Sequence, residues 1–459
     1  MLARLGISVR SGFGRVVPDP FAIAVLLTAA VMLTALAGGR APLDLLRDWG
    51  RGSGLWKLLT FTMQMCAMLV LGTALAAAPA IRAGLSGLAR RVSSPRALVA
   101  LVALVSIVLS LLNWSLCLVG GALLAREAGR EAARRGTSVH YPLLCAAGYA
   151  GMMTWHGGFS GSAPLKATTA AGMTEVLGPD LAARAGVIPL TESVLGSLNM
   201  VVTGGLLVLG PLLFYWLTPR AGDDPDAVAC DRSSRVSAPA EVREPPSASA
   251  PRTWVERIEQ SSAIVWLLAL PMAAALGLTL AEHGVSRLDF DTVNLALWCG
   301  ALVLHGRPAR FLAACEDGVR GCTGIILQFP LYAGIMGVMA GAGLSAALSR
   351  SLSAVGGGAF AVMAFLSAGL LNLLIPSGGG QWAVQGPILV EGALSLGLPV
   401  SDVMMAMAYG DQWTNMLQPF WALPLLAITG VRARDIIGYT AIWMLAGGLW
   451  ITGCLVWMV

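Results

Sequence analysis

The chain has 459 residues, of which 56% are hydrophobic and only 12% are charged. Soluble domains carry about 25% charged residues because water must solvate their surfaces, so this composition excludes an ordinary soluble protein and predicts a surface that faces lipid. The net charge of +5 gives no sign of a nucleic-acid partner, because the basic residues lie between apolar blocks rather than along one face.

Long charge-free runs predict nine membrane-spanning helices, since about 20 apolar residues cross the hydrocarbon core as a helix. The first run follows Pro18 and Pro20 and is not followed by a convincing small-residue cleavage site, so we expect it to remain as a span. The nine spans are expected at residues 20–38, 58–80, 141–165, 187–217, 260–281, 292–306, 322–347, 401–425 and 436–457.

Two further apolar segments predict re-entrant hairpins. Arginines flank the uncharged run between Arg96 and Arg126 on both sides, so this run must enter and leave the membrane from one face if positive loops stay in the cytoplasm. We expect this hairpin at about residues 97–125, with Asn113 near its tip. The second hairpin is expected at about residues 351–390, although its length would also allow two full spans.

The distribution of basic residues predicts the orientation. With a cytoplasmic N-terminus, the expected cytoplasmic segments hold 22 of the 30 lysines and arginines, as the positive-inside rule requires. Residues 218–259 are charged and rich in proline, serine and alanine, so we expect a disordered cytoplasmic linker there.

An internal repeat divides the chain. Similar residues recur at separations of 259 to 264 positions, which suggests two related halves. The matched pairs are Gln64 with Gln328, Asn113 with Asn372, and Tyr149 with Tyr409. The expected division is a first repeat at 1–217, the linker at 218–259, an extra helix at 260–290 and a second repeat at 291–459. Since the extra helix turns the second copy upside down, we expect an all-α polytopic membrane protein built from two inverted-topology repeats.

Four stretches combine helix breakers with small polar side chains inside these apolar segments, at residues 113–115, 154–164, 376–382 and 409–419. Freed amides at helix N-termini attract anions, while unwound carbonyls and hydroxyls bind small cations. The candidate substrate-binding or ion-binding residues are Asn113, Trp114, Ser115, Thr154, His156, Gly157, Gly158, Ser160, Ser162, Asn372, Ser377, Gly378, Gly379, Gly380, Gln381, Asp411, Gln412, Thr414, Asn415 and Gln418.

Asp411 and His156 are the ionisable candidates. An acid inside a span is usually functional, so Asp411 is expected to take up a proton or to help bind Na⁺, the other interpretation being a structural acid paired with a hydroxyl or amide. His156 fits a proton carrier and a satisfied core histidine equally well. We expect every arginine and lysine to lie away from the midplane, so amides, hydroxyls or a cation would have to hold an anionic substrate.

Glycines and tryptophans near the breaks have two interpretations each. Isolated glycines favour close helix packing, whereas the run Gly378–Gly380 favours a binding role. Tryptophans accompany all four stretches and either wall a small apolar tail or pack in the core. They are Trp114, Trp155, Trp382 and Trp413.

At these motifs the sequence resembles the bacterial short-chain fatty acid transporter family, which includes acetoacetate and butyrate permeases. The segments that carry the resemblance are Trp49-Gly50, Leu55-Trp-Lys-Leu-Leu59, Asn113-Trp114, Ala125-Arg-Glu127, Gly157-Gly-Phe-Ser-Gly-Ser162, Ile375-Pro-Ser-Gly-Gly-Gly380, Gln385-Gly-Pro387, Gln412-Trp413 and Gln418-Pro-Phe-Trp-Ala-Leu-Pro424. The resemblance implies uptake of short monocarboxylates across the inner membrane, with substrate and ion held at hairpin tips and unwound helices. The chain departs from the expected pattern at His156, Lys166 and Asp411.

Alternative functions follow from the same residues. A GxxxxGK[ST] loop is absent from the sequence, so transport would be driven by an ion gradient or by the substrate's own gradient, and we expect Na⁺ or H⁺ as the coupling ion with no other cofactor. The runner-up is a dicarboxylate or other organic-anion symporter. A more distant alternative is an intramembrane serine hydrolase that uses Ser160 in Gly158-Phe-Ser-Gly161 with His156 as its base. The oligomeric state stays open, with a homodimer as one option.

Overall fold

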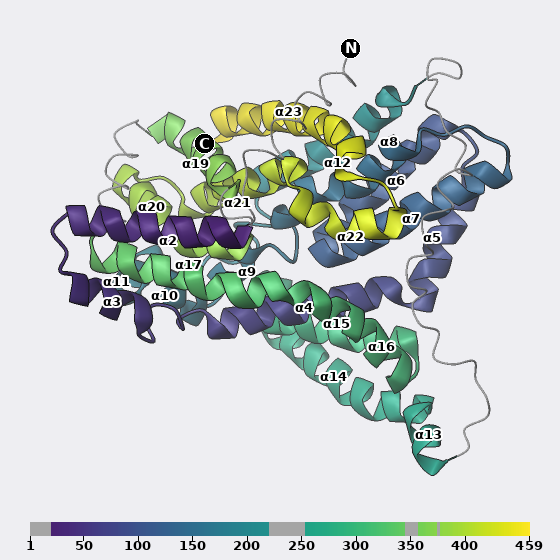
Figure 1. The fold of residues 1–459 in the computed structure, drawn as a ribbon, viewed down its shortest axis with the longest axis horizontal. Helices are drawn as coiled ribbons and strands as arrows, with labels where there is room; N and C mark the ends of the chain where they lie inside the picture. Colours follow the sequence, from purple (N-terminus) through teal and green to yellow (C-terminus); the bar gives the residue numbers. More distant parts are fainter. Residues whose placement is uncertain (1–19, 220–252, 345–356, 374–376) are drawn as a thin grey trace.

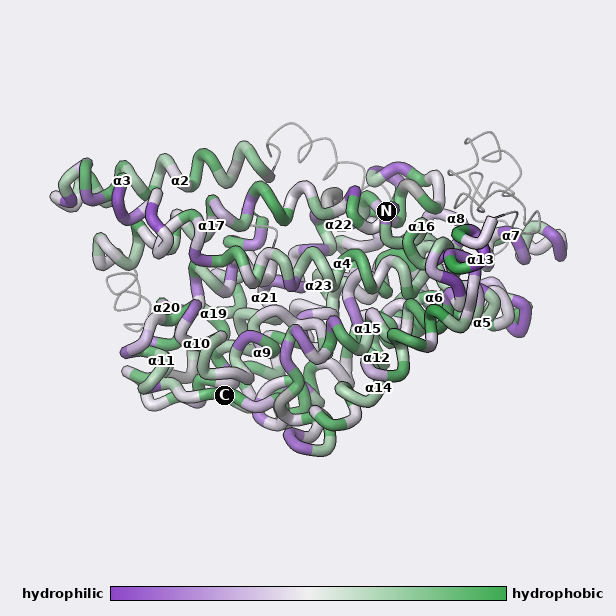
Figure 2. Tube along the Cα trace, turned by 90° about the horizontal axis from the view of Figure 1, so that it is seen from below, coloured by the Kyte–Doolittle hydropathy of each residue, from purple (hydrophilic) through white to green (hydrophobic). Residues whose placement is uncertain are grey.

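The computed structural model describes residues 20–219, 253–344, 357–373 and 377–459, and these ranges contain helices but no strand. Six helical segments there are long and apolar enough to cross a membrane. Large apolar side chains on them point outward, and Trp216 and Trp457 are each 81% exposed. Figure 2 shows apolar residues along most helices, with hydrophilic residues gathered near the ends labelled α5, α7 and α13. The structure is therefore that of a polytopic membrane protein.

The first part of the chain forms long apolar helices joined by short ones. Proline starts several of them, because its fixed φ suits the first helical position and its missing N–H is not needed there. The elements are α2 (Pro20–Ala37), α3 (Pro42–Gly50), α4 (Leu59–Ala77), α5 (Pro79–Arg91), α6 (Pro95–Leu112), α7 (Trp114–Arg134), α8 (Tyr141–Tyr149), η1 (Ala150–Met153), η2 (Trp155–Gly157), α9 (Ser162–Ala167), α10 (Ala170–Leu177), α11 (Pro179–Ala185) and α12 (Ser197–Leu217).

The span predicted at 187–217 begins ten residues late, at Ser197. Pro189 and Gly196 disfavour helix, and the backbone before α12 bonds elsewhere. The N–H of Ile188 donates to Ala167 O and that of Leu190 donates to Ser286 O. These apolar residues are buried in a loop. The length of an apolar run does not distinguish such a loop from a helix.

The second part of the chain contains α14 packed along α15 at the outside of the molecule (Figure 1). The elements are α13 (Trp254–Glu259), α14 (Ser262–His283), η4 (Val285–Arg287), α15 (Phe290–His305), α16 (Pro308–Val319), η5 (Arg320–Cys322), α17 (Thr323–Gly341), α19 (Gly357–Asn372), α20 (Gly378–Leu396), α21 (Val400–Thr414), η6 (Asn415–Leu417), α22 (Pro419–Thr429) and α23 (Ala433–Met458). Most of the predicted linker lies outside the described residues, but its end is helical in α13, where Thr253 and Glu256 form a capping box.

The helix–break–helix predicted near residue 113 is present as α6 and α7, which pack against each other. They meet at Asn113, whose backbone is extended (φ −161°, ψ 132°). Arg135, directly after α7, donates to the carbonyl oxygens of Arg90, in the last turn of α5, and of Val92, between α5 and α6. The start and the end of this hairpin therefore lie together. Helix α7 runs to Arg134, past the predicted end at 125, because its charged last turns stay helical.

The second hairpin joins α19 to α20, with residues 374–376 outside the described ranges. Ser377 begins α20 in an extended conformation (φ −158°, ψ 111°), close to that of Asn113 before α7. Asn113 and Ser377 thus precede α7 and α20 with similar backbone angles, while Asn372, which the sequence analysis paired with Asn113, is the last residue of α19. Helix α20 continues to Leu396 rather than to the predicted end at 390.

Candidate functional site

The span predicted at 141–165 is interrupted, and α6 supports the interruption. The hydroxyl of Ser106 donates to Gly148 O (2.7 Å) and accepts from the Gly151 N–H (3.0 Å), so a side chain satisfies backbone groups where the helix loosens. A Cβ on Gly151 would lie 2.3 Å from Ser106 O, so glycine permits this approach. The N–H of Phe159 donates to Leu111 O (2.7 Å) and completes the connection.

The second interruption lies between α21 and α22. Pro419 has no N–H to donate to the carbonyl of Asn415, and the Tyr149 hydroxyl donates to that carbonyl instead (2.9 Å). Helix α21 continues to Thr414, so the prediction that the chain is irregular from residue 409 is wrong. Asp411 lies in the last turn of a regular helix, because the break follows from Pro419 and not from Gly410.

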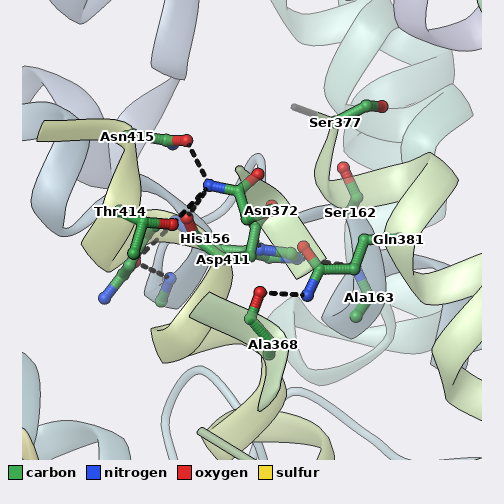
Figure 3. A network of polar contacts seen from close by, with 12 residues as sticks. His156, Ser162, Ala163, Ala368, Asn372, Ser377, Gln381, Asp411, Thr414 and Asn415 are labelled. Atoms are coloured by element: carbon green, nitrogen blue, oxygen red, sulfur yellow. Dashed lines mark hydrogen bonds and ion pairs between the residues drawn. The ribbon is translucent and has the colours of Figure 1, made fainter. Parts of the chain in front are cut away.

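The two interruptions meet through side chains, as Figure 3 shows. Nδ1 of His156 lies 2.7 Å from Oδ2 of Asp411, and both side chains are buried, with exposures of 0% and 1%. Oε1 of Gln412 accepts from the N–H groups of His156 (3.0 Å) and Gly157 (3.3 Å). These contacts bring together four of the predicted residues, His156, Gly157, Asp411 and Gln412.

The contacts of His156 define its protonation state. The N–H of Ala163 donates to Nε2 of the imidazole (3.1 Å), so that nitrogen is an acceptor and carries no proton. A neutral imidazole has one donor and one acceptor nitrogen, hence Nδ1 carries the hydrogen and donates it to Asp411. Trp155 stacks on the imidazole with ring centroids 4.5 Å apart and fixes its plane.

Asn372 completes the polar centre from the end of α19. Its amide nitrogen lies within hydrogen-bond distance of Asp411 O (2.6 Å), Thr414 Oγ1 (3.0 Å) and Asn415 Oδ1 (2.8 Å). Gln418 in turn donates to the carbonyl of Asn372. Five predicted residues of the second half are thus connected in one network around the last turn of α21.

The N-terminus of α20 lies against the hydrogen-bonded pair of His156 and Asp411. A Cβ on Gly378 would lie 2.7 Å from the Trp155 ring, 2.8 Å from the His156 ring and 3.0 Å from Asp411 Oδ2. Gly379 and Gly380 pack just as closely, on Phe61 and Tyr332. All three glycines therefore pack closely, and Gly378 in addition brings the positive end of the α20 dipole to the polar centre.

A cavity of about 20 Å³ lies beside this helix end. Its walls are mostly apolar, with polar groups from Gln328 and Ser377. The lining residues are Met65, Trp114, Met152, Trp155, Gly324, Ile325, Gln328, Phe329, Ser377, Gly378 and Trp421. Trp114 and Trp155 thus line the cavity as one interpretation predicted, whereas Trp382 and Trp413 pack elsewhere, against Gly386 and Phe365. Trp421, which the sequence analysis missed, supplies a third ring 5.4 Å from that of Trp114.

Several predicted residues have structural partners instead. Oδ1 of Asn113 caps α7 by accepting from the N–H groups of Ser115 and Leu116, and the Trp114 N–H donates to the hydroxyl of Ser160. The first N–H groups of α7 therefore have partners within the first half, whereas in α20 the Ser377 hydroxyl accepts from the N–H of Gly380 (3.3 Å). Three further predicted side chains bond within the first half or within the second hairpin. Ser115 donates to Leu69 O, Thr154 bonds to Ser110, and Gln381 donates to Ala368 O and Gln385.

The remaining predicted residues of the first interruption pack against its neighbours. A Cβ on Gly158 would lie 2.6 Å from Leu111, so this glycine allows α6 to approach. Ser162 lies 3.9 Å from the sulfur of Met65, next to the cavity. Since both nitrogens of His156 bond elsewhere and Ser160 accepts from a backbone N–H, the contacts do not form the nucleophile–base pair of a serine hydrolase.

Lys166 is a basic residue that is buried beside the candidate site. Its side chain is 6% exposed, its Nζ lies 2.5 Å from Glu175 Oε2, and it lies 4.8 Å from the centroid of the Phe61 ring that packs on Gly379. A lysine within an apolar segment is the signal that identifies it. Its acidic partner is not readable from the sequence, because a helix break separates the two.

Polar atoms without a hydrogen-bond partner gather at this site within the described ranges. The buried atoms are Asn113 Nδ2, Trp114 Nε1, Trp155 Nε1, Asn372 Oδ1, Gln381 Oε1, Asp411 Oδ1, Gln412 Nε2, Asn415 Nδ2 and Gln418 Oε1. Folded proteins leave few such atoms unsatisfied, and exceptions often mark water, an ion or a ligand. Such atoms also occur elsewhere in the described structure, but their number around this centre makes it a candidate binding site.

A larger cavity of about 450 Å³, here called the vestibule, lies further along the same two helices. Helices α17 and α20 line both cavities, with Gln328 and Gly378 at the small one and Met336 and Pro387 at the vestibule. Charged residues of the vestibule are Asp48, Lys57 and Glu391.

Apolar helices of membrane-spanning length, interrupted around a buried polar centre, define a multi-pass membrane protein of the transporter class. The model of the family described as "Short chain fatty acid transporter" matches residues 1–458. A relative from Escherichia coli (strain K12), named "Putative short-chain fatty acid transporter", is 35% identical over 455 residues and 98% of each chain. A relative of the same name from Haemophilus influenzae (strain ATCC 51907 / DSM 11121 / KW20 / Rd) is 34% identical over 445 residues, 96% of each. The chain therefore belongs to the short-chain fatty acid transporter family, and the resemblance is confirmed.

Two solved structures share the fold. The Alcanivorax borkumensis YdaH transporter matches with a TM-score of 0.60 at 15% identity, over 96% of this chain and 99% of that chain. Neisseria gonorrhoeae MtrF, described with a class of antimetabolite efflux pumps, matches with a TM-score of 0.54 at 17% identity, over 96% and 94%. At these identities the likeness shows the fold alone. The family assignment makes the chain a transporter rather than an enzyme.

Proposed function

We propose that this chain is a secondary active transporter that takes up short-chain monocarboxylates such as butyrate or acetoacetate, coupled to Na⁺ or H⁺. The observation that carries the proposal is the small cavity in which the rings of Trp114, Trp155 and Trp421 face the N-terminus of α20. The helix end suits a carboxylate and the rings suit a short apolar tail.

The size of the cavity supports alternating access. A volume of about 20 Å³ holds about one water molecule, so a four-carbon acid can bind only when the walls move apart. Both interrupted helices contribute to this region, which is the arrangement in which two repeats open the site to each side in turn.

The proposed topology has two inverted repeats and a cytoplasmic N-terminus in the inner membrane. The contacts of Arg135 with Arg90 and Val92 support an α6–α7 hairpin that enters and leaves from one face. The similar caps at Asn113 and Ser377 support the repeat. The assembly we favour is a homodimer.

A dicarboxylate symporter is the less favoured alternative. A second carboxylate needs a second neutralising group, and among the described residues near the cavity the buried base Lys166 is already paired with Glu175. The N-terminus of α20 therefore remains to bind one carboxylate of the substrate.

Counterflow in proteoliposomes tests the proposal. Vesicles loaded with unlabelled butyrate should take up labelled butyrate transiently, faster than protein-free vesicles, and external acetoacetate should compete whereas succinate should not. Absence of counterflow with all short monocarboxylates would refute the proposed function. Competition by succinate alone would favour the dicarboxylate symporter.

A further inference from the structure

We infer that protons drive this transporter, and that the transported proton binds Oδ1 of Asp411 while His156 stays neutral throughout. The inference rests on the proposed function and assigns the coupling ion and its atom. The geometry of the His156–Asp411 pair carries it (Figure 3).

His156 is held in one protonation state from both sides. Nε2 accepts from the N–H of Ala163, and Nδ1 donates to Oδ2 of Asp411. A second proton could bind the imidazole only at Nε2, where it would face a backbone N–H and leave that donor unsatisfied inside the protein. The histidine is therefore a fixed donor to Asp411 and a poor carrier.

Asp411 has one oxygen open to a proton. Oδ2 accepts from His156, whereas Oδ1 is buried and bonds to none of the residues that the structure describes. Protonation at Oδ1 converts the carboxylate to a neutral acid and leaves the bond from Nδ1 intact. One proton is gained and one negative charge disappears, with no other group changed.

Other charged groups around Asp411 are distant or already paired. Among the described residues, α19, η1 and η6 bring no titratable side chain to α21, and η2 brings His156. The remaining titratable residues on α21 and on the elements packed against it are Lys166, Glu391, Asp402, Tyr409, Arg434, Asp435, Tyr439 and Cys454. Lys166 pairs with Glu175, Glu391 with Arg184, and Asp435 with Arg432 and Arg434. The net charge around Asp411 therefore changes mainly when Asp411 itself gains or loses a proton.

The arrangement disfavours Na⁺ at Asp411. Hard cations require several oxygen ligands at once. The nearby carbonyl oxygen of Asp411, Thr414 Oγ1 and Asn415 Oδ1 all face the amide nitrogen of Asn372, and Gln412 Oε1 accepts from two N–H groups. A proton needs one oxygen, and Asp411 Oδ1 provides it.

Coupling follows from the position of α20. The helix end proposed to hold the substrate carboxylate is the one whose first glycine lies against Asp411 Oδ2. Two carboxylates this close in a site with little water cannot easily both stay ionised, so anion binding favours proton binding and the reverse. The substrate anion and the proton would cross together as a neutral load.

Initial rates of butyrate uptake test the inference. Protein-free vesicles provide the baseline, because protonated short acids cross lipid unaided. An inward proton gradient in Na⁺-free buffer should accelerate uptake by the wild-type protein, and a Na⁺ gradient at equal pH should not. Asp411→Asn should lose all acceleration by the proton gradient, because its amide neither binds nor releases a proton, and the rate of any remaining counterflow should not depend on pH. Asp402→Asn on the same helix is the matched control and should behave as wild type.

His156→Gln separates the two possible carriers. Glutamine offers one donor and one acceptor without titrating, so this variant should keep acceleration by the proton gradient. As a readout independent of transport, infrared difference spectra on acidification should contain the band of one buried protonated carboxylic acid that is present in wild type and in His156→Gln and is missing from the spectrum of Asp411→Asn.

Three outcomes would overturn the inference and leave the proposed function intact. They are acceleration of uptake by Na⁺ alone, proton dependence of uptake that is retained in Asp411→Asn, and proton dependence that is lost in His156→Gln while the acid band is unchanged. Loss of counterflow in the wild-type protein would instead overturn the proposed function.

Discussion

Gly378 shows how one residue without a side chain positions the whole centre. It places the first turn of α20 against Trp155, His156 and Asp411 at distances that a Cβ does not tolerate. A larger residue would therefore separate the helix dipole from the acid.

We predict that Gly378→Ala abolishes uptake and lowers the free energy of unfolding by about 1–3 kcal/mol, as overpacking typically does. Uptake assays and thermal denaturation in detergent would measure the two effects. Gly277→Ala in α14 is the matched control, because a Cβ there meets nothing within 4 Å, and it should leave uptake unchanged. Normal transport by Gly378→Ala would show that this approach is not required.

Trp114 limits the length of the acid in the proposed site. Its ring stands at right angles to that of Trp421, with centroids 5.4 Å apart and an interplanar angle of 77°, and both rings line the small cavity. Removing one ring lengthens the apolar pocket.

We predict that Trp114→Ala shifts preference from butyrate toward hexanoate, since each buried methylene contributes about 0.8 kcal/mol. Competition of both acids for counterflow would measure the shift. Trp298→Ala, at a ring 44% exposed on α15, should leave the preference unchanged. An equal loss of both acids in Trp114→Ala would assign the ring to stability instead.

At the scale of elements, the geometry of the α6–α7 hairpin indicates whether this segment re-enters on one face of the membrane or crosses it twice. Its two outer ends lie together, tied by Arg135. Arg91 ends α5 just before α6, Arg130 lies in the last turns of α7, and both are exposed.

Cysteines introduced at Arg91 and Arg130 should react with a membrane-impermeant maleimide from the same face of oriented vesicles. We expect this face to be cytoplasmic, as the positive-inside rule predicts. The native cysteines would first be replaced by alanine, with uptake as the control for folding. Labelling from opposite faces would contradict the hairpin.

The elements also show what the sequence could predict. Glycine and proline residues predicted that both helices are interrupted, because these residue types alter backbone geometry. The position of the second break was wrong, since the proline rather than the glycine next to Asp411 decides it. Short helices such as α3, α10 and α16 were not predicted, because the length of an apolar run detects only spans. The pairing of Lys166 with Glu175 required coordinates, as did the place of Trp421.

At the scale of the molecule, the two cavities lie in sequence along α17 and α20. The vestibule carries both signs of charge, whereas the inner cavity is largely apolar. In the proposed topology Lys57 lies on the outer side, so an approaching anion would meet a cation before it reaches the tryptophan rings. Such a charge raises the local concentration of an anionic substrate.

We predict that Lys57→Gln raises the apparent KM for butyrate several-fold at low ionic strength and leaves the maximal rate unchanged, because attraction at a distance affects access rather than the closed site. The difference from wild type should shrink at about 0.15 M salt, where charges are screened beyond about 8 Å. Burial lowers the pKa of Lys57, and the nearby Glu175 opposes this only in part. The lysine is cationic below its pKa, so its advantage over glutamine should disappear on alkalinisation at a lower pH than for an exposed lysine. Lys57→Arg should retain the advantage at alkaline pH, because guanidinium stays charged. If the difference in apparent KM between Lys57→Gln and wild type does not change with salt or pH, the vestibule is not on the route of the substrate.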